Sequence, residues 1–299
     1  MPDLRTALDG ISGILVTPFD REDKLAPAAL AHIVKRAISA GVQALVANGN
    51  TSEFYALTMS EAELAVQVAA ECVAGRVPLL AGVGRGVPDA CALARVSRAA
   101  GATGLMVHQL PDPFVAPSGV VNYVQRIADA GEGLPLVLYL RDDGIGLETI
   151  EQLCRLPLVV GVKWASPTPL RLAEAMSRVS DLDIAWVCGL AEPWAPPMYA
   201  VGARGFTSGL INVLPELSVR IHAALAAADY AEANRLIATV AVFEGLRAKE
   251  RNGSNVSVVK AALQMLGNDC GAARPPATWP LPEQDLSTLS AFMTGNAGA

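Results

Sequence analysis

Short apolar runs recur along the chain, and each is followed by a segment whose apolar positions repeat with helical spacing. The runs occupy residues 13–19, 44–49, 77–83, 104–109, 134–140, 159–164, 184–189 and 205–210. A run that is apolar at every position is typical of a parallel strand covered on both faces, and alternation with helices favours βα units. Eight such units predict an α/β protein with a closed (β/α)8 TIM barrel.

The junctions between helices and strands repeat as well. A Gly stands between a helix end and a new strand in residues 39–46, 99–107 and 200–208. Gly at that place ends a helix in the left-handed conformation. Helix starts are marked by "SEAE" at 60–63, which has the spacing of a capping box. Further starts are marked by prolines suited to a first helical turn, at Pro88, Pro117 and Pro167.

The pattern changes after residue 214, where strand-like runs stop. Four helices are predicted there, at residues 214–228, 229–250, 254–267 and 283–293, with a loop at 272–282. No low-complexity linker precedes them. We therefore expect residues 1–228 to form the barrel and residues 229–299 to form a C-terminal helical subdomain.

Composition narrows the class of protein. The chain is 52% hydrophobic and 17% charged, which favours a well-buried globular enzyme. A net charge of −6 without basic clusters argues against nucleic acid as a partner. No apolar run is long enough for a bilayer and no leader pattern opens the chain, so we expect a cytoplasmic protein without membrane association. Five scattered cysteines without metal-ligand spacing predict reduced thiols and no bound metal.

Candidate site residues follow from strand order, because the active site of a (β/α)8 barrel lies at the C-terminal ends of its strands. In strand order, these positions are Thr17 and Pro18, residues 49–53, residues 84–86, His108 and Gln109, Tyr139 and Arg141, Lys163, Cys188 and Gly189, and Ser208 and Gly209.

Lys163 is unusual because it ends an apolar run in a chain with only five lysines against eighteen arginines. Burial lowers the pKa of a lysine from ~10.4, and a value around ~7 would leave an amine able to attack a ketone. The product of that attack is a Schiff base, which withdraws electrons from the neighbouring carbon. The alternative is an amine that reaches the barrel rim and pairs with an acid; position alone leaves both open.

Tyr139 is predicted at the same height on the neighbouring strand, about 4.8 Å away. Its hydroxyl could exchange protons with a group bound to Lys163, or it could be a core tyrosine bonded to backbone. The following candidate is the loop "GNTSE" at 49–53, whose N–H groups and Asn50, Thr51 and Ser52 side chains could hold a carboxylate. An ordinary polar turn is the alternative, and Glu53 is expected to anchor this loop.

Other signals have simpler interpretations. His108 is placed at the mouth, either touching substrate or as a hydrogen-bonded histidine of the rim. The segment "GVGRG" at 82–86 lacks the glycine spacing of a dinucleotide site and is interpreted as a tight turn. Asp142 and Asp143 have no further ligand at metal-binding spacing and are interpreted as solvated loop acids. No cofactor is therefore expected.

Six segments together resemble one family along nearly the whole chain. They are "GILVTPFD" (13–20), "ANGNTSEFYALTMSE" (47–61), "GRVPLLAGVG" (75–84), "AAGATGLMV" (99–107), "VLYLRD" (137–142) and "VVGVKWAS" (159–166). The chain resembles the dihydrodipicolinate synthase / N-acetylneuraminate lyase superfamily of class I aldolases and dehydratases. The resemblance implies a barrel with C-terminal helices, a Lys163 Schiff base to a 2-keto acid, Tyr139 as proton shuttle, and Asn50 and Thr51 on the carboxylate. It also implies a homodimer or homotetramer.

The likeness is closer to 5-dehydro-4-deoxyglucarate dehydratases. It depends on "YLRDD" (139–143), on Phe54 after the loop acid, and on "NVSVVKAALQMLG" (255–267) followed by "RPP". In that subfamily Arg141 would bind an acidic or hydroxylated part of the substrate, and His108, Gly189 and Ser208 complete the expected binding surface. The chain departs from the dihydrodipicolinate synthases where it has Asn50 and Ser52 in the loop, Trp164 after the lysine, and Phe114 in place of a second tyrosine.

The main hypothesis is a cofactor-free lyase that forms a Schiff base with a 2-keto acid or a deoxy-keto sugar acid. The alternative from another class is a catalytically altered barrel that binds small carboxylates. A nicotinamide-dependent reductase is less favoured because no dinucleotide site is found in the sequence. The rim side chains Arg141, His108, Trp164 and Trp194 are expected to select the substrate.

Overall fold

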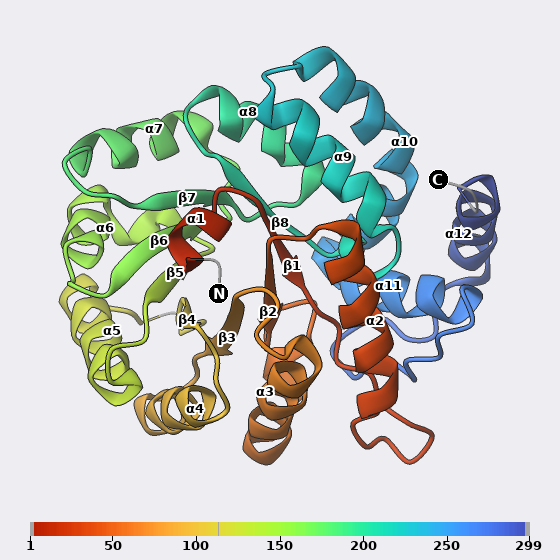
Figure 1. Ribbon diagram of the computed structural model, residues 1–299, viewed down its shortest axis with the longest axis horizontal. Helices are drawn as coiled ribbons and strands as arrows, with labels where there is room; N and C mark the ends of the chain where they lie inside the picture. The colour runs from red at the N-terminus through yellow and green to blue at the C-terminus, as the bar shows by residue number, and fades with distance from the viewer. Residues whose placement is uncertain (1–2, 113, 297–299) are drawn as a thin grey trace.

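A closed barrel of eight parallel strands forms the centre of the computed structural model, which describes residues 3–112 and 114–296. The strands pair in chain order and β8 closes on β1 (Figure 1). Their bounds are β1 Ile11–Ile14, β2 Ala44–Ala47, β3 Leu79–Val83, β4 Gly104–His108, β5 Leu136–Leu140, β6 Val159–Trp164, β7 Ala185–Cys188 and β8 Gly205–Ser208. The predicted (β/α)8 TIM barrel is confirmed.

Helices surround the barrel and cover its outer face (Figure 1). The first part of the chain contributes α1 Leu4–Ala7, α2 Pro27–Ala40, α3 Met59–Val73, α4 Val87–Ala99, α5 Pro117–Gly131, α6 Leu147–Cys154, α7 Pro169–Arg178, α8 Ala195–Ala200 and α9 Pro215–Ala226. The C-terminal helices are α10 Tyr230–Ala248, α11 Asn255–Met265 and α12 Glu283–Gly295. Short 3-10 turns, η1 Phe54–Ala56, η2 Asp143–Ile145, η3 Glu192–Trp194, η4 Leu210–Asn212 and η5 Glu250–Asn252, lie in the connections. The four helices predicted after residue 214 are confirmed.

Most predicted junctions are present. Gly41, Gly101 and Gly202 have φ of 99°, 89° and 123°, the left-handed conformation expected after a helix. The capping box was misplaced, because Thr58 and Glu61 form it and α3 begins at Met59. Glu61 also forms an ion pair with Arg274, which lies far along the chain. Pro167 also precedes its helix, since α7 has Pro169 in the first turn.

The first strand is shorter and earlier than predicted. Residues 15–19 leave the sheet beyond Ile14, and the N–H of Phe19 donates to the carbonyl of Cys270 instead of to a strand. An apolar run identifies burial but does not tell a strand from a buried loop. Phe19 is buried by the C-terminal part of the chain, which the run by itself does not reveal.

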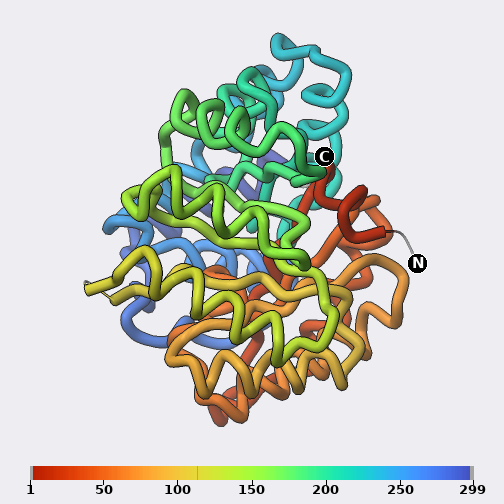
Figure 2. The backbone as a smooth tube through the Cα atoms, turned by 90° about the vertical axis from the view of Figure 1, so that its left-hand side faces the viewer, coloured from red at the N-terminus to blue at the C-terminus, as the bar shows by residue number. Residues whose placement is uncertain are grey.

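Apolar side chains fill the barrel from within as well as from without. Inside, Val46, Leu80, Met106 and Val137 pack together with Leu4 and Leu8 of the N-terminal segment. Outside, a larger cluster fills the space between the strands and the surrounding helices. Figure 2 shows α1 on one side of the barrel and the segment around residues 250–282 on the other. The strands terminate at the end of the barrel opposite α1, where the segment around residues 250–282 lies.

The chain after α11 returns to the loops that follow β1 and β2. Besides the bond from Phe19 to Cys270, Arg274 pairs with Asp23 and Glu61 at 2.9 and 2.7 Å.

The predicted boundary between a barrel ending at residue 228 and a helical subdomain starting at residue 229 stays a prediction. In the part of the chain that is described, no helix is long and apolar enough to cross a membrane.

One glycine in the barrel wall gives a test of this packing. A Cβ on Gly205 would lie 2.0 Å from the carbonyl oxygen of Leu8, a backbone atom that cannot rotate away. We expect Gly205→Ala to lower the free energy of unfolding by more than ~2 kcal/mol in denaturant titrations. Gly245→Ala is the control, since Gly245 is an exposed position of α10 where a Cβ meets nothing within 4 Å. This substitution should stabilise the protein by ~0.5–1 kcal/mol.

Candidate active site

Lys163 and Tyr139 lie next to each other on neighbouring strands. The register pairs Tyr139 of β5 with Lys163 of β6. The Lys163 Nζ lies 3.8 Å from the centroid of the Tyr139 ring. Both residues are only 4% exposed. The two residues therefore lie at the same height in the barrel, as predicted.

The environment of the Lys163 amine is apolar. It shares a small internal cavity with side chains such as Leu8, Leu80 and Met106, with Ser12 and Thr207 as polar neighbours. Burial lowers the pKa of Lys163 to about 7, and the positive charge of Arg141 acts in the same direction. No acid pairs with Lys163 among the ion pairs of residues 3–112 and 114–296. The alternative of an amine paired with an acid at the rim is not what this geometry shows.

Tyr139 is connected to the loop after β2. Its hydroxyl accepts a hydrogen bond of 2.9 Å from the Asn50 side-chain amide. Burial is the main cause that raises the pKa of Tyr139 to about 12, so the phenol keeps its proton at neutral pH. Its side chain is therefore bonded to the loop rather than to backbone, and it can donate the proton that it holds.

Residues 49–53 form a tight loop that is bound to the segment following β1. Ser52 Oγ accepts from the N–H of Gly49 at 2.9 Å and donates to the carbonyl of Leu15 at 2.5 Å. Thr17 Oγ1 donates to the carbonyl of Ser52 at 2.7 Å. These bonds give Ser52 a part in building the loop. Its expected contact with substrate stays a prediction. Asn50 keeps a buried Oδ1 without a partner, and Thr51 is 4% exposed.

His108 lies deeper than expected. It is 1% exposed, its Nε2 is 2.9 Å from the carbonyl of Asn48, and its ring stacks on Phe54 at 4.6 Å. Burial lowers the pKa of His108 to about 3, so the ring is neutral. Its centroid is 5.2 Å from that of Tyr139. The structure therefore shows His108 as a buried, hydrogen-bonded histidine packed beside the tyrosine. Its contact with substrate stays a prediction.

Gly189 and Ser208 serve the barrel wall. A Cβ on Gly189 would lie 2.7 Å from the Cβ of Ala165, so only Gly allows this approach of β7 to β6. Ser208 Oγ donates to Glu192 Oε1 at 2.6 Å and is fully buried with Ser218. The Ser208 hydroxyl is thus already bonded within the protein. A place for Gly189 and Ser208 in the binding surface stays a prediction.

The rim is formed by fewer side chains than expected. Arg141 is exposed, and its charge acts on the pKa values of Lys163, His108 and Tyr139. Trp164 is fully buried against Trp186 in the outer layer and does not reach the rim. Trp194 is 38% exposed. Phe114 is 93% exposed.

Tyr55 lies beside the candidate site and was not singled out in the sequence analysis. Its ring lies 5.7 Å from His108 and 5.0 Å from Phe54, it is 42% exposed, and Arg141 acts on its pKa. Burial remains the larger cause and raises that pKa. In the sequence, Tyr55 could have been noticed from its position two residues after Glu53 and directly after Phe54.

Metal ligands are not gathered in the described ranges. No group of three or more His, Cys, Asp or Glu side chains could hold a metal ion within residues 3–112 and 114–296. All five cysteines lie in these ranges as free thiols.

Known proteins resemble this chain over nearly its whole length. The sequence pattern of the Dihydrodipicolinate synthetase family matches residues 7–295. A probable 5-dehydro-4-deoxyglucarate dehydratase of Chelativorans sp. is 31% identical over 97% of both chains. A probable 5-dehydro-4-deoxyglucarate dehydratase of Streptomyces coelicolor is 34% identical over 84% of this chain and 81% of its own. The crystal structure of a dihydrodipicolinate synthase from Bacillus clausii has a TM-score of 0.94 and 35% identity, covering 99% of this chain and 100% of that one.

The buried amine should lower the stability of the protein. The pKa of Lys163 falls from 10.5 to about 7 on folding, so below pH 7 the folded state holds a charge that burial disfavours. This penalty is fully present below pH 7 and disappears as the pH rises to 10.5. We expect Lys163→Met to raise the free energy of unfolding by ~2–4 kcal/mol at pH 7, with a smaller gain at pH 9.

Guanidinium titrations at the two pH values measure this effect. Lys35→Met, which replaces a lysine for which the described residues show no buried contact, is the control and should change stability by less than ~0.5 kcal/mol. Equal stability of Lys163→Met and the original protein at pH 7 would contradict the assignment of a desolvated amine.

Proposed function

The chain belongs to the Dihydrodipicolinate synthetase family and is a lyase, and we propose that it acts through a Schiff base on a 2-keto acid or a deoxy-keto sugar acid. In this proposal Lys163 binds the ketone, Tyr139 moves protons, and Asn50 and Thr51 hold the carboxylate. The observation that carries the proposal is the desolvated Lys163 amine, 3.8 Å from the ring of a tyrosine that is hydrogen-bonded to the loop.

The chemistry follows from the states of these two groups. The neutral Lys163 amine adds to the ketone carbon, the carbonyl oxygen leaves as water, and a protonated imine forms. The iminium acidifies the adjacent carbon, which loses a proton and becomes an enamine. The enamine then expels a hydroxyl from the next carbon as water, or a bond to that carbon breaks or forms. Water finally hydrolyses the imine and frees Lys163.

Tyr139 is suited to relay these protons rather than to be a standing base. Because its pKa is raised to about 12, the phenol is protonated and can donate to the oxygen that leaves. The Asn50 amide donates to the same hydroxyl oxygen, so the phenolic hydrogen is directed elsewhere. The nearest candidate for that hydrogen is a group bound at Lys163.

The preference for a sugar acid is supported by Arg141 and by the relatives. Arg141 is exposed after β5, two residues beyond Tyr139, where a guanidinium can bind a distal carboxylate or hydroxyl. Two relatives with 31% and 34% identity are named probable 5-dehydro-4-deoxyglucarate dehydratases. Water loss from a deoxy-keto sugar acid is therefore the favoured reaction. The homodimer or homotetramer expected from the resemblance stays a prediction.

Reductive trapping tests the Schiff base. With pyruvate and sodium cyanoborohydride, we expect one reduced adduct on the peptide that contains Lys163, measured by mass spectrometry. Exposed Lys24 serves as the internal control and should stay unlabelled. Lys163→Met should abolish labelling. Absence of any adduct in the original protein would overturn the lyase proposal and favour the small-carboxylate binding protein.

Tyr139→Phe separates imine formation from proton transfer. The variant keeps the ring over Lys163 and loses only the hydroxyl. We expect the adduct with pyruvate still to form, while exchange of the pyruvate methyl protons with D2O slows by ~100-fold or more in NMR spectra. Tyr199→Phe is the matched control, because its hydroxyl bonds to the carbonyl of Arg204 elsewhere in the barrel. Unchanged exchange in Tyr139→Phe would remove the tyrosine from the mechanism.

The rate of trapping should depend on pH in one direction. Only the neutral amine attacks, and the pKa of Lys163 is about 7. We expect the initial rate of labelling at a fixed low pyruvate concentration to rise about tenfold from pH 5 to pH 6 and to level off above pH 8. A profile that still rises steeply between pH 9 and pH 10 would show an amine with an ordinary pKa, contrary to the structure.

A further inference from the structure

The loop of residues 49–53 ends at a residue whose backbone is held in an unfavourable conformation. Glu53 has φ 59° and ψ 31°, the left-handed region that side chains other than Gly seldom adopt. Such a conformation persists when the surroundings over-determine it. The contacts of the Glu53 carboxylate, rather than the barrel strands, supply that constraint.

Both oxygens of Glu53 are bound by the C-terminal part of the chain. Oε1 lies 2.6 Å from Lys260 Nζ of α11, and Oε2 accepts the backbone N–H of Arg274 at 2.7 Å. The side chains of Glu53 and Lys260 are 3% and 0% exposed. A buried charge pair of this kind fixes geometry, because removal of one partner leaves the other charge without compensation.

Lys260 is itself fixed in place. Its Nζ donates to the carbonyl of Ala272 at 2.9 Å and lies 4.3 Å from the centroid of the Phe19 ring. Burial lowers the pKa of Lys260, and the charge of Glu53 acts in the opposite direction. Of the five lysines, Lys163 and Lys260 are the two that are buried. Of these two, only Lys260 has an acid as partner within residues 3–112 and 114–296.

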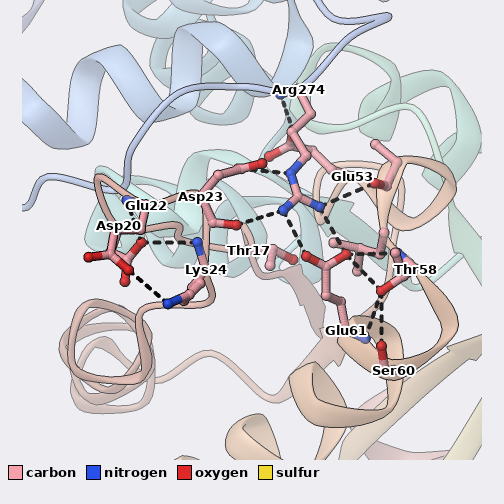
Figure 3. Close-up of polar contacts among 12 residues, drawn as sticks. Thr17, Asp20, Glu22, Asp23, Lys24, Glu53, Thr58, Ser60, Glu61 and Arg274 are labelled. Atoms are coloured by element: carbon pink, nitrogen blue, oxygen red, sulfur yellow. Dashed lines mark hydrogen bonds and ion pairs between the residues drawn. The ribbon is translucent and has the colours of Figure 1, made fainter.

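Arg274 joins the same assembly to the loops after β1 and β2. Its guanidinium binds both oxygens of Glu61 at 2.7 and 3.0 Å and Oδ1 of Asp23 at 2.9 Å (Figure 3). It also lies 4.0 Å from the centroid of the Phe19 ring. Arg274 is the main cause that lowers the pKa of Glu61 to about 2. The C-terminal segment is thus bound to two loops of the barrel mouth.

A short series of bonds connects this assembly to the proposed active site. The N–H of Glu53 donates to the carbonyl of Asn50 at 3.0 Å, and the Asn50 side chain donates to the hydroxyl of Tyr139. The Ser52 hydroxyl accepts the N–H of Gly49 at the other end of the loop, and Ser52 itself is bonded to Leu15 and Thr17. Displacement of Glu53 would therefore move Asn50 and the N–H groups around it, while Lys163 on β6 would stay in place.

We infer that Lys260 is a positioning residue, which fixes the carboxylate-binding loop of residues 49–53 through its ion pair with Glu53. The C-terminal helical part of the chain thereby sets the geometry of a site to which it contributes no group that touches substrate. The inference rests on the proposed function for the identity of the ligand. It assigns to α11 a role in binding of the keto acid rather than in imine formation.

The test compares three variants of the full chain. Lys260→Met removes the lysine charge with little loss of side-chain length. The double variant Glu53→Gln/Lys260→Met removes both charges of the pair. Lys249→Met is the matched control, because it breaks an ion pair with Asp285 in the same C-terminal part. Each is labelled with pyruvate and cyanoborohydride over a range of pyruvate concentrations. In parallel, hydrogen exchange of the peptide covering residues 49–57 is measured without pyruvate.

We expect Lys260→Met and the double variant to need at least tenfold more pyruvate for half-maximal labelling, with the maximal yield within about twofold of the original protein. Exchange at residues 49–57 should be at least tenfold faster in both, and exchange in β5 and β6 should not change. Lys249→Met should match the original protein in both measurements. This separation of half-saturation from yield is not expected of a general loss of stability.

Each outcome decides between the two proposals. The positioning role would be overturned if the double variant showed the same pyruvate dependence of labelling and the same hydrogen exchange at residues 49–57 as the original protein. The double variant gives this answer even where Lys260→Met alone fails to fold. Failure of the original protein to label would reject the proposed function, and the exchange measurement would still decide whether Lys260 holds the loop.

Discussion

The proposed chemistry depends on a desolvated amine that the register of two parallel strands places against a tyrosine. Lys163 and Tyr139 occupy paired positions on β6 and β5, so the barrel itself brings the Nζ within 3.8 Å of the ring. Closure of the interior by Leu4 and Leu8 of the N-terminal segment and by the apolar layer above them keeps water from the amine. The resulting fall of its pKa to about 7 costs stability and makes the nitrogen a nucleophile at neutral pH.

Alternation along the strands explains why neighbours in sequence have different roles. Lys163 points into the barrel, whereas Trp164 points outward and packs on Trp186 in the layer beneath the helices. A position directly after the lysine thus cannot act on a substrate in the barrel mouth. The same rule separates Val187, inside, from Cys188, outside. In the proposed function, selection of the substrate is therefore assigned to residues of the loops, such as Arg141 and Tyr55.

Two parts of the chain together hold the loop that is proposed to bind the carboxylate. The barrel fixes it through Thr17 and Ser52, and the C-terminal segment fixes it through Glu53. Glu53 is bound to Lys260 and to the backbone N–H of Arg274, which is the contact set of an anchor rather than of a base. In the two proposals, Lys260, which is buried with an acid, holds a loop, whereas Lys163, for which the described residues show no acid partner, carries the chemistry.

The sequence by itself determined the barrel, the four C-terminal helices and the pair formed by Lys163 and Tyr139. These follow from local periodicity and from the regular height of strand ends, which any parallel barrel shares. Only the tertiary structure decided that Ser52 and Ser208 bond to the protein, that His108 is buried beside Tyr139, and that Trp164 faces outward. It also joined Glu53 to Lys260, 207 positions later. Periodicity reports which face of an element is buried, but the partner of a polar group is set by contacts between distant segments, and no local pattern contains them.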